Sequence, residues 1–185
     1  MVTPTFDISH HRRVAAARTT RADGEPLRYR LDVVAASAAD VVQSAGGWLY
    51  DRVMAGWEVT VLLPDGCDSR SLRILGVQAF DGEARPDLAA SRSQSLAVSA
   101  EAFAADARVR EKVLESLGDW WTEVALWGDG WPLGVDRATT RTQHVLSAAA
   151  RRFKGYALAA AGLACDSVDP TESLLCDMAA LARLS

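Results

Sequence analysis

Hydrophobic and polar residues follow two different periods in turn along the chain, and this pattern predicts alternating strands and helices. Every second residue is apolar over 27–33, as in a strand with one buried face, whereas residues 57–63 are largely apolar and β-branched, as in an interior parallel strand. Apolar residues recur at helical spacing over 41–53, behind an N-cap at Ser37. The same criteria predict a short helix over 68–75, strands over 77–80 and 122–127, and helices over 98–117, 139–162 and 170–184.

This order of elements predicts an α/β fold. Parallel strands need a crossover connection, and right-handed crossovers place helices on the faces of the sheet. We therefore expect a three-layer α/β/α sandwich with a mainly parallel sheet of four or five strands and C-terminal helices. The rhythm is Rossmann-like, but the first strand-to-helix turn (residues 35–40, AASAAD) has no glycine, so a glycine phosphate loop is absent.

The two ends of the chain differ in character. Residues 1–26 contain Pro4, Gly24 and Pro26, have little periodicity and predict a flexible, basic N-terminal arm. Six arginines against three acidic residues fall in the first thirty positions, although the chain as a whole has a net charge of −4. Hydrophobic residues make up 49% of the sequence, enough for a proper core, so residues 27–185 are predicted to form a single α/β domain.

The sequence also suggests a compartment. No apolar run approaches the roughly 18 residues that cross a bilayer, and the N-terminus lacks the pattern of a secretion signal. The three cysteines form no Cys-x-x-Cys pair, which favours reduced thiols over a zinc site. We expect a cytoplasmic protein without a membrane partner.

Candidate ligand-binding residues lie just after the predicted strands, because ligands of parallel sheets bind at the carboxyl ends of the strands. On this ground we expect Ser37, Asp65, Asp68, Asp129 and Trp131 to contact a ligand.

Three strand-end aspartates also suggest a metal. Asp65, Asp81 and Asp129 would supply the oxygen ligands that Mg²⁺ prefers if the strand ends converge. Each is followed by glycine, however, and Asp-Gly pairs occur in turns for local reasons alone. The sequence leaves both interpretations open and names no other cofactor.

Catalytic residues are not evident. The chain has no Gly-x-Ser-x-Gly motif, and His144 is its only histidine outside the arm, at the start of a predicted helix. Whether the protein is an enzyme is left open.

A basic patch is a further candidate. Arg151, Arg152 and Lys154 lie together on a predicted helix, and with Arg12 and Arg13 of the arm they would bind nucleic acid or an acidic partner. The acidic body makes nucleic acid the less favoured partner.

Three functional hypotheses follow. The leading one is a non-catalytic binding or regulatory domain that acts through a protein partner or a small ligand at the carboxyl edge of the sheet, because no phosphate loop, triad or metal cluster is recognisable. The alternatives are a Mg²⁺-dependent enzyme acting on a nucleotide or phosphorylated substrate, and a nucleic-acid-associated protein that uses the basic arm.

Overall fold

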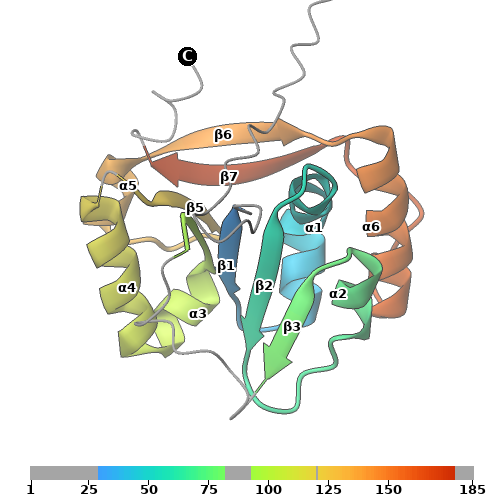
Figure 1. Ribbon diagram of the computed structural model, residues 1–185, viewed down its shortest axis with the longest axis horizontal. Coiled ribbons are helices and arrows are strands. Elements are labelled where there is room, and N and C mark those ends of the chain that lie inside the picture. Colours follow the sequence, from blue (N-terminus) through green and yellow to red (C-terminus); the bar gives the residue numbers. More distant parts are fainter. Residues whose placement is uncertain (1–28, 82–92, 120, 178–185) are drawn as a thin grey trace, which may run out of the picture.

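The computed structural model describes residues 29–81, 93–119 and 121–177 (Figure 1). Within these residues seven strands form one sheet, in the order β3-β2-β1-β4-β5-β7-β6. The elements in chain order are β1 (Arg30–Val34), α1 (Ala38–Met54), β2 (Glu58–Leu63), α2 (Arg70–Ile74), β3 (Gln78–Asp81), β4 (Ser95–Ser99), α3 (Ala100–Ala105), α4 (Ala107–Gly118), β5 (Glu123–Trp127), α5 (Leu133–Ala138), β6 (Thr139–Val145), α6 (Ala148–Ala160) and β7 (Thr171–Asp177).

The predicted fold class is confirmed, with more strands than expected. Strands β3, β2, β1, β4 and β5 run parallel to one another, and β7 is antiparallel to both β5 and β6. The chain winds outward from β1 to β3 and then returns to β4 on the other side of β1. The five parallel strands therefore share one carboxyl edge, and the strand order reverses between β1 and β4.

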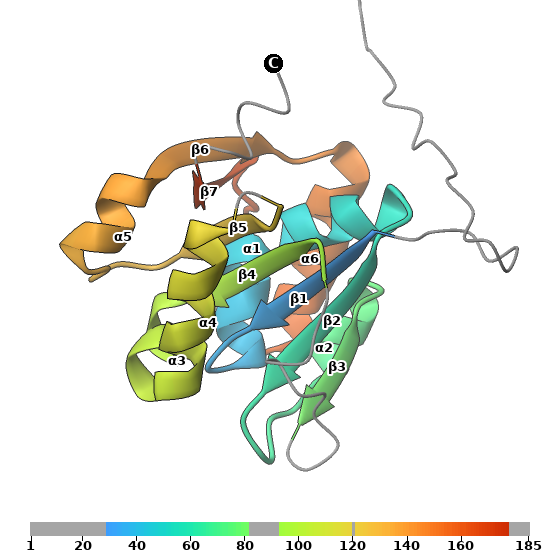
Figure 2. The same cartoon turned by 60° about the vertical axis from the view of Figure 1, so that its left-hand side comes forward.

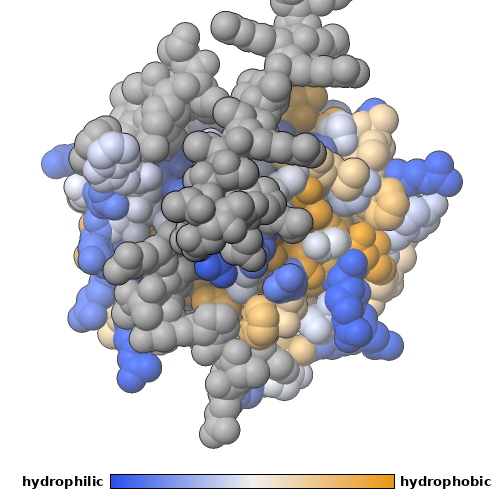
Figure 3. All heavy atoms as spheres, viewed as in Figure 1, coloured by the Kyte–Doolittle hydropathy of each residue, from blue (hydrophilic) through white to orange (hydrophobic). Residues whose placement is uncertain are grey.

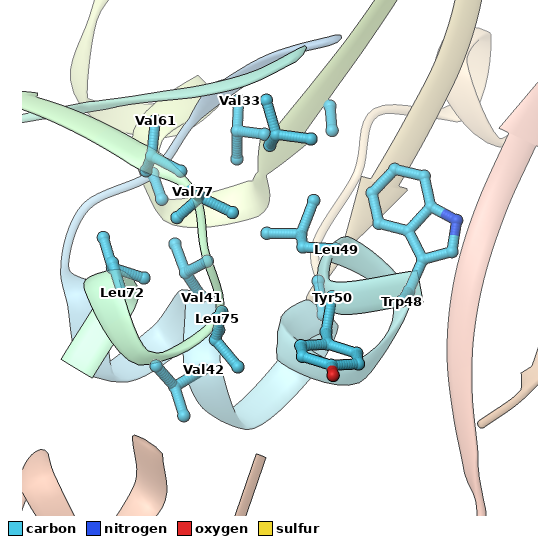
Figure 4. Packing of buried hydrophobic residues seen from close by; sticks show 14 of the residues in the cluster. Val33, Val41, Val42, Trp48, Leu49, Tyr50, Val61, Leu72, Leu75 and Val77 are labelled. Atoms are coloured by element: carbon cyan, nitrogen blue, oxygen red, sulfur yellow. The ribbon is translucent and has the colours of Figure 1, made fainter. Parts of the chain in front are cut away.

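Helices cover both faces of the sheet (Figures 1 and 2). One hydrophobic cluster joins the sheet to α1, α2 and α6, and a second joins it to α3, α4 and α5. Burial of such apolar surface is the main force that holds the layers together. Figure 4 shows part of the first cluster, in which Val33 of β1 and Val61 of β2 face the side of α1 and α2. The residues on that side include Val41, Leu49, Leu72 and Leu75.

The central strand β4 was not predicted, and its last two residues fall within the helix expected over 98–117. Residues Ser95–Ser99 (SLAVS) are buried at every position, because β4 lies between β1 and β5 with helices on both faces. The helix predicted over 98–117 is divided at Asp106, whose side chain caps α4 by accepting the N–H of Arg108 at 2.8 Å.

The predicted pair of C-terminal helices is also wrong. The first seven residues of the helix expected over 139–162 form strand β6, and α6 begins only after Ser147, whose Oγ accepts the N–H of Ala150 at 3.0 Å. Residues 171–177, expected to begin a last helix, form β7 between β5 and β6. Short apolar runs do not distinguish a strand from a helix by periodicity, and here the pairing of β7 with β5 and β6 decides.

The remaining expectations concern the two ends of the chain and membrane spans. The predicted arm, residues 1–26, lies outside the described residues, as do residues 178–185. None of the helices in the described part of the chain combines the length and hydrophobicity that a membrane span requires.

Candidate ligand-binding site

A pocket of about 400 Å³ lies at the carboxyl edge of the sheet, and three segments that are distant in sequence form it. The start of α1 contributes residues 37–39, the connection from β2 into α2 contributes Cys67, Asp68, Arg70 and Ser71, and the end of α6 contributes residues 160–162. We call this the edge pocket. Its position agrees with the rule that ligands of parallel sheets bind beyond the carboxyl ends of the strands.

The start of α1 lines the edge pocket and carries backbone donors without helical partners. Ser37 is the N-cap in extended conformation, and its Oγ accepts the N–H of Asp40 at 3.1 Å. The N–H groups of Ala38 and Ala39 belong to the first turn, where a helix supplies no carbonyl partner. Both residues line the pocket with no side chain larger than a methyl group.

The carboxylate in this first turn is held on the side of β5. The Oδ2 atom of Asp40 accepts the indole N–H of Trp127 at 2.9 Å, and Oδ1 accepts the hydroxyl of Ser44 at 3.1 Å. Trp127 is the last residue of β5 and is 2% exposed. The Asp40 carboxylate therefore has two donors of its own at the N-terminus of α1.

The other wall of the edge pocket carries a close ion pair. The guanidinium of Arg70 donates from Nε and Nη2 to Oδ2 of Asp68 at 2.9 and 2.7 Å, and the backbone N–H of Arg70 donates to Oδ1 at 3.0 Å. These hydrogen bonds from Arg70 lower the pKa of Asp68 to about 2. Asp68 is therefore anionic over the ordinary pH range, and the pair has almost no net charge.

The space beyond β4 and β5 is filled by packing. Gly128 follows Trp127 with φ +88°, and a Cβ at Gly128 would lie 2.9 Å from the Cβ of Ala100 at the start of α3. Trp131 is 8% exposed, its ring packs against Phe103 at a centroid distance of 4.9 Å, and its indole N–H donates to the carbonyl of Gly128 at 3.2 Å. Trp131 is thus a core residue rather than an exposed stacking surface for a ligand.

The structure does not bring the predicted metal ligands Asp65 and Asp129 together. Asp65 follows β2 and Asp129 follows β5, so two strands lie between those that carry them. At about 4.8 Å per strand interval the two chain positions are roughly 14 Å apart, whereas Mg²⁺ and Ca²⁺ hold their ligands at about 2.0–2.6 Å. Asp81 ends β3, and its side chain is outside the description. Among the described residues no group of three His, Cys, Asp or Glu side chains is placed to hold a metal ion.

Two of the five predicted ligand-binding residues lie in the edge pocket. Ser37 and Asp68 line the edge pocket, whereas Asp65, Asp129 and Trp131 are not among its lining residues. Sequence reasoning missed Cys67, Arg70 and Ser71, although all three follow β2 closely and the strand-end rule covers that connection. The contribution of α6 has no local signal, because it depends on how α6 packs against α1 and α2.

Lys154 does not belong to an exposed basic patch, because its side chain is buried. Lys154 is 5% exposed, and its Nζ donates to Oε1 of Glu172 at 2.6 Å and to the carbonyl of Gln43 at 2.7 Å. Arg152 donates from Nε to the hydroxyl of Tyr156 at 2.9 Å. Arg151 and Arg152 are exposed, whereas Arg12 and Arg13 lie outside the described residues. On the face drawn in Figure 3, hydrophilic residues are scattered rather than gathered in one patch.

His144 lies on β6 rather than at the start of a helix. Its Nε2 lies 2.9 Å from Oδ2 of Asp51, an oxygen that also accepts the N–H of Ser147 at 3.2 Å. The histidine therefore ties the connection between β6 and α6 to α1, far along α1 from the edge pocket.

The fold and the position of the edge pocket define a doubly wound α/β protein, and solved structures share this architecture. No protein-family model matches the chain, and no curated protein matches its sequence. A teicoplanin deacetylase in complex with teicoplanin is similar over 80% of this chain and 97% of its own, with a TM-score of 0.55 and 13% identity. An antimicrobial-reagent pseudoaglycone deacetylase has the same coverage, a TM-score of 0.54 and 14% identity.

A third neighbour is the 4-carboxy-2-hydroxymuconate hydratase of Pseudomonas putida. It is similar over 80% of this chain and 95% of its own, with a TM-score of 0.51 and 12% identity. All three neighbours are enzymes, and at these identities the likeness concerns the fold. The leading hypothesis of a non-catalytic regulatory domain is therefore wrong. It rested on the absence of familiar catalytic motifs, and the solved structures that share this fold are enzymes.

Proposed function

We propose that the protein is an enzyme that binds a small polar substrate in the edge pocket. The observation that carries the proposal is the pocket itself, which lies beyond the carboxyl ends of β1 and β2. Its volume of about 400 Å³ falls within the roughly 300–1,000 Å³ of small-molecule sites. The enzymes that share the fold support catalysis over a purely structural role.

The lining determines the kind of substrate. Hydroxyl, thiol, carboxylate and guanidinium groups come from Ser37, Cys67, Asp68 and Arg70, and apolar contacts come only from small alanine side chains. A large hydrophobic substrate would find few partners there, whereas a compact molecule with several polar atoms would find donors and acceptors on two walls. One neighbour's name describes loss of an acetyl group and another's describes addition of water, so a test of turnover should include both reactions.

A ligand screen with a matched pair of variants tests this proposal. Thermal unfolding would be followed with N-acetylated sugars, short hydroxy acids, unsaturated carboxylic acids and sugar phosphates, since a compound at a hundred times its Kd adds about 2.7 kcal/mol to stability. Compounds that bind would be titrated by calorimetry and followed by NMR for deacetylation or hydration.

The variants place one large side chain inside or outside the edge pocket. Ala160→Phe adds a phenyl group at a lining position near the end of α6, and Ala159→Phe adds the same group at the preceding exposed position, which is not a lining residue. We expect Ala160→Phe to weaken binding about tenfold or more, a loss of about 1.4 kcal/mol, and Ala159→Phe to leave it unchanged. The proposal would be overturned if Ala160→Phe left the Kd unchanged, or if no bound compound were converted to product.

A further inference from the structure

We infer that the edge pocket holds an oxyanion of the substrate, a phosphate or a carboxylate, between the N-terminus of α1 and the side chains of Arg70 and Ser71. This inference rests on the proposed function and adds the chemical class of the substrate. Three observations carry it, two on α2 and one at the start of α1.

The first observation is the hydroxyl of Ser71. Ser71 is 3% exposed and lines the edge pocket, yet its side chain forms no hydrogen bond with any residue in the described ranges. No fully buried side-chain oxygen among those residues lacks a hydrogen-bond partner, so the Ser71 oxygen keeps some accessible surface, and the residue lines the pocket. Other buried hydroxyls have protein partners, such as that of Thr139, which donates to the carbonyl of Val135 at 3.0 Å. A hydroxyl that is nearly buried and lacks a partner is a donor available to a ligand.

The second observation is the start of α1 on the opposite wall. The N–H groups of Ala38 and Ala39 carry the positive end of the dipole of a 17-residue helix, and both residues line the same pocket. Such N-terminal N–H groups bind phosphate and carboxylate in many proteins. Asp40 in the first turn would oppose an anion, but its two oxygens accept from Trp127 and Ser44 on the side of β5.

The third observation is that Arg70 already binds a carboxylate in the manner inferred for the ligand. Its guanidinium donates from two nitrogens to Asp68, the geometry that arginine uses for carboxylates and phosphates. The two side chains are 75% and 55% exposed, and an exposed ion pair is weak because water screens the two charges. A second anion can therefore share the guanidinium while Asp68 keeps the backbone N–H of Arg70 as a donor.

Titration of the full chain with inorganic phosphate and with acetate tests the inference. Backbone amide signals would be followed by NMR at constant ionic strength, with sodium chloride as the reference salt. We expect the signals of Ala38, Ala39 and Ser71 to shift and saturate with at least one of the two anions. Saturation with phosphate alone would assign a phosphorylated substrate, and saturation with acetate would assign a carboxylate; either supports the inference.

Matched variants on α2 separate the site from general electrostatics. Arg70→Gln and Arg73→Gln remove the same charge from exposed positions on the same helix, but only Arg70 lines the pocket. Ser71→Ala and Ser69→Ala form a second pair, because Ser69 is outside the lining and makes no capping hydrogen bond. We expect Arg70→Gln to weaken anion binding about tenfold and Ser71→Ala about fivefold, with both controls within about twofold of the wild type.

The outcomes also distinguish this inference from the proposed function. Signals that drift without saturating, as they do with chloride, would overturn the anion site. Equal effects of Arg70→Gln and Arg73→Gln would do the same. If a neutral compound from the screen binds and loses affinity in Ala160→Phe while neither anion saturates, the inference fails and the proposed function stands.

Discussion

The carboxylate of Glu172 on β7 accepts the backbone N–H of Gly47, in the middle of α1, at 2.8 Å. Its second oxygen accepts the N–H of Trp48 at 2.7 Å. In a regular α-helix these N–H groups pair with the carbonyls of Gln43 and Ser44, and the Gln43 carbonyl here accepts from Lys154 of α6. A buried ion pair of Lys154 and Glu172 thus satisfies backbone groups of α1 from outside the helix. This contact fixes α6 against α1, and the end of α6 forms one wall of the edge pocket.

Removal of one member of this ion pair is expected to destabilise the protein strongly. Glu172→Ala leaves the ammonium of Lys154 buried without its carboxylate and leaves the N–H groups of Gly47 and Trp48 without their acceptor. A buried charge that loses its partner costs about 3–5 kcal/mol. Urea unfolding measures the change.

The control for Glu172→Ala is an ion pair on the surface. Glu115→Ala breaks the contact between Lys112 and Glu115, which is 3.3 Å long and has a glutamate side chain that is 73% exposed. We expect that change to stay within about 0.5 kcal/mol. A loss below about 1 kcal/mol in Glu172→Ala would contradict the role given to the buried pair.

Two adjacent glycines of α1 should respond differently to alanine. A Cβ at Gly47 would lie 2.6 Å from both Cδ atoms of Leu146, whereas a Cβ at Gly46 would lie 3.3 Å from Cδ1 of Leu75. We expect the overpacking at Gly47, about 1–3 kcal/mol, to exceed the gain of about 1 kcal/mol in helix propensity, so that Gly47→Ala destabilises the protein. Gly46→Ala should be close to neutral, because the helix propensity of alanine, better by about 1 kcal/mol, offsets its milder contact. Equal unfolding free energies for the two variants would contradict the packing of Leu146 onto α1.

The carboxyl of Asp68 should titrate well below its ordinary pKa of 3.8. The hydrogen bonds from Arg70 lower its pKa to about 2, so the stabilisation of the ionised form is complete above about pH 4 and is lost as the pH falls through about 2. NMR of the side-chain carboxyl carbon should show Asp68 still ionised at pH 3.5. In Arg70→Gln the midpoint should move back towards 3.8. A wild-type midpoint near 4 would show that the pair does not form in solution.

The three cysteines are expected to differ in reactivity. Burial raises the pKa of the Cys176 thiol on β7, although a hydrogen bond with Thr142 partly opposes the shift. Because the thiolate is the reactive form, Cys176 should alkylate slowly at pH 8, and the exposed Cys165 should alkylate first. Mass spectrometry of samples quenched over time gives the order of modification. Equal rates at Cys165 and Cys176 would contradict the placement of β7 inside the sheet.

The sequence predicted the elements whose burial pattern is simple. Strands β1, β2, β3 and β5 and helix α1 lie close to their predicted positions. In the strands, alternating or continuous apolar residues have one interpretation, and in α1 so does an apolar stripe at helical spacing behind an N-cap. Strand β4 was missed, since its five residues are buried on both faces and adjoin a helix directly. The C-terminal strands were missed because β7 pairs with β5, more than forty residues earlier, and β6 pairs with β7, and local periodicity carries no information about either pairing.

The candidate site was predictable only in part for the same reason. The strand-end rule identifies Ser37 and Asp68 because their positions depend on local connections after β1 and β2. The rule also selected Asp129 and Trp131, but Trp131 turns back to pack on Phe103. Convergence of carboxylates depends on strand order, and β1 and β4 between β2 and β5 separate Asp65 from Asp129.

Protection of Cys67 from alkylation tests most directly whether the edge pocket binds a substrate. Cys67 lines the pocket and Cys165 is exposed elsewhere, so the wild-type chain carries both the probe and its control. The reagent would be iodoacetamide, and the ligand would be the screened compound with the largest thermal shift, at about a hundred times its Kd. We predict that the compound slows modification of Cys67 about tenfold or more and leaves Cys165 unchanged. Unchanged modification of Cys67 with the compound bound would contradict the edge pocket as the binding site.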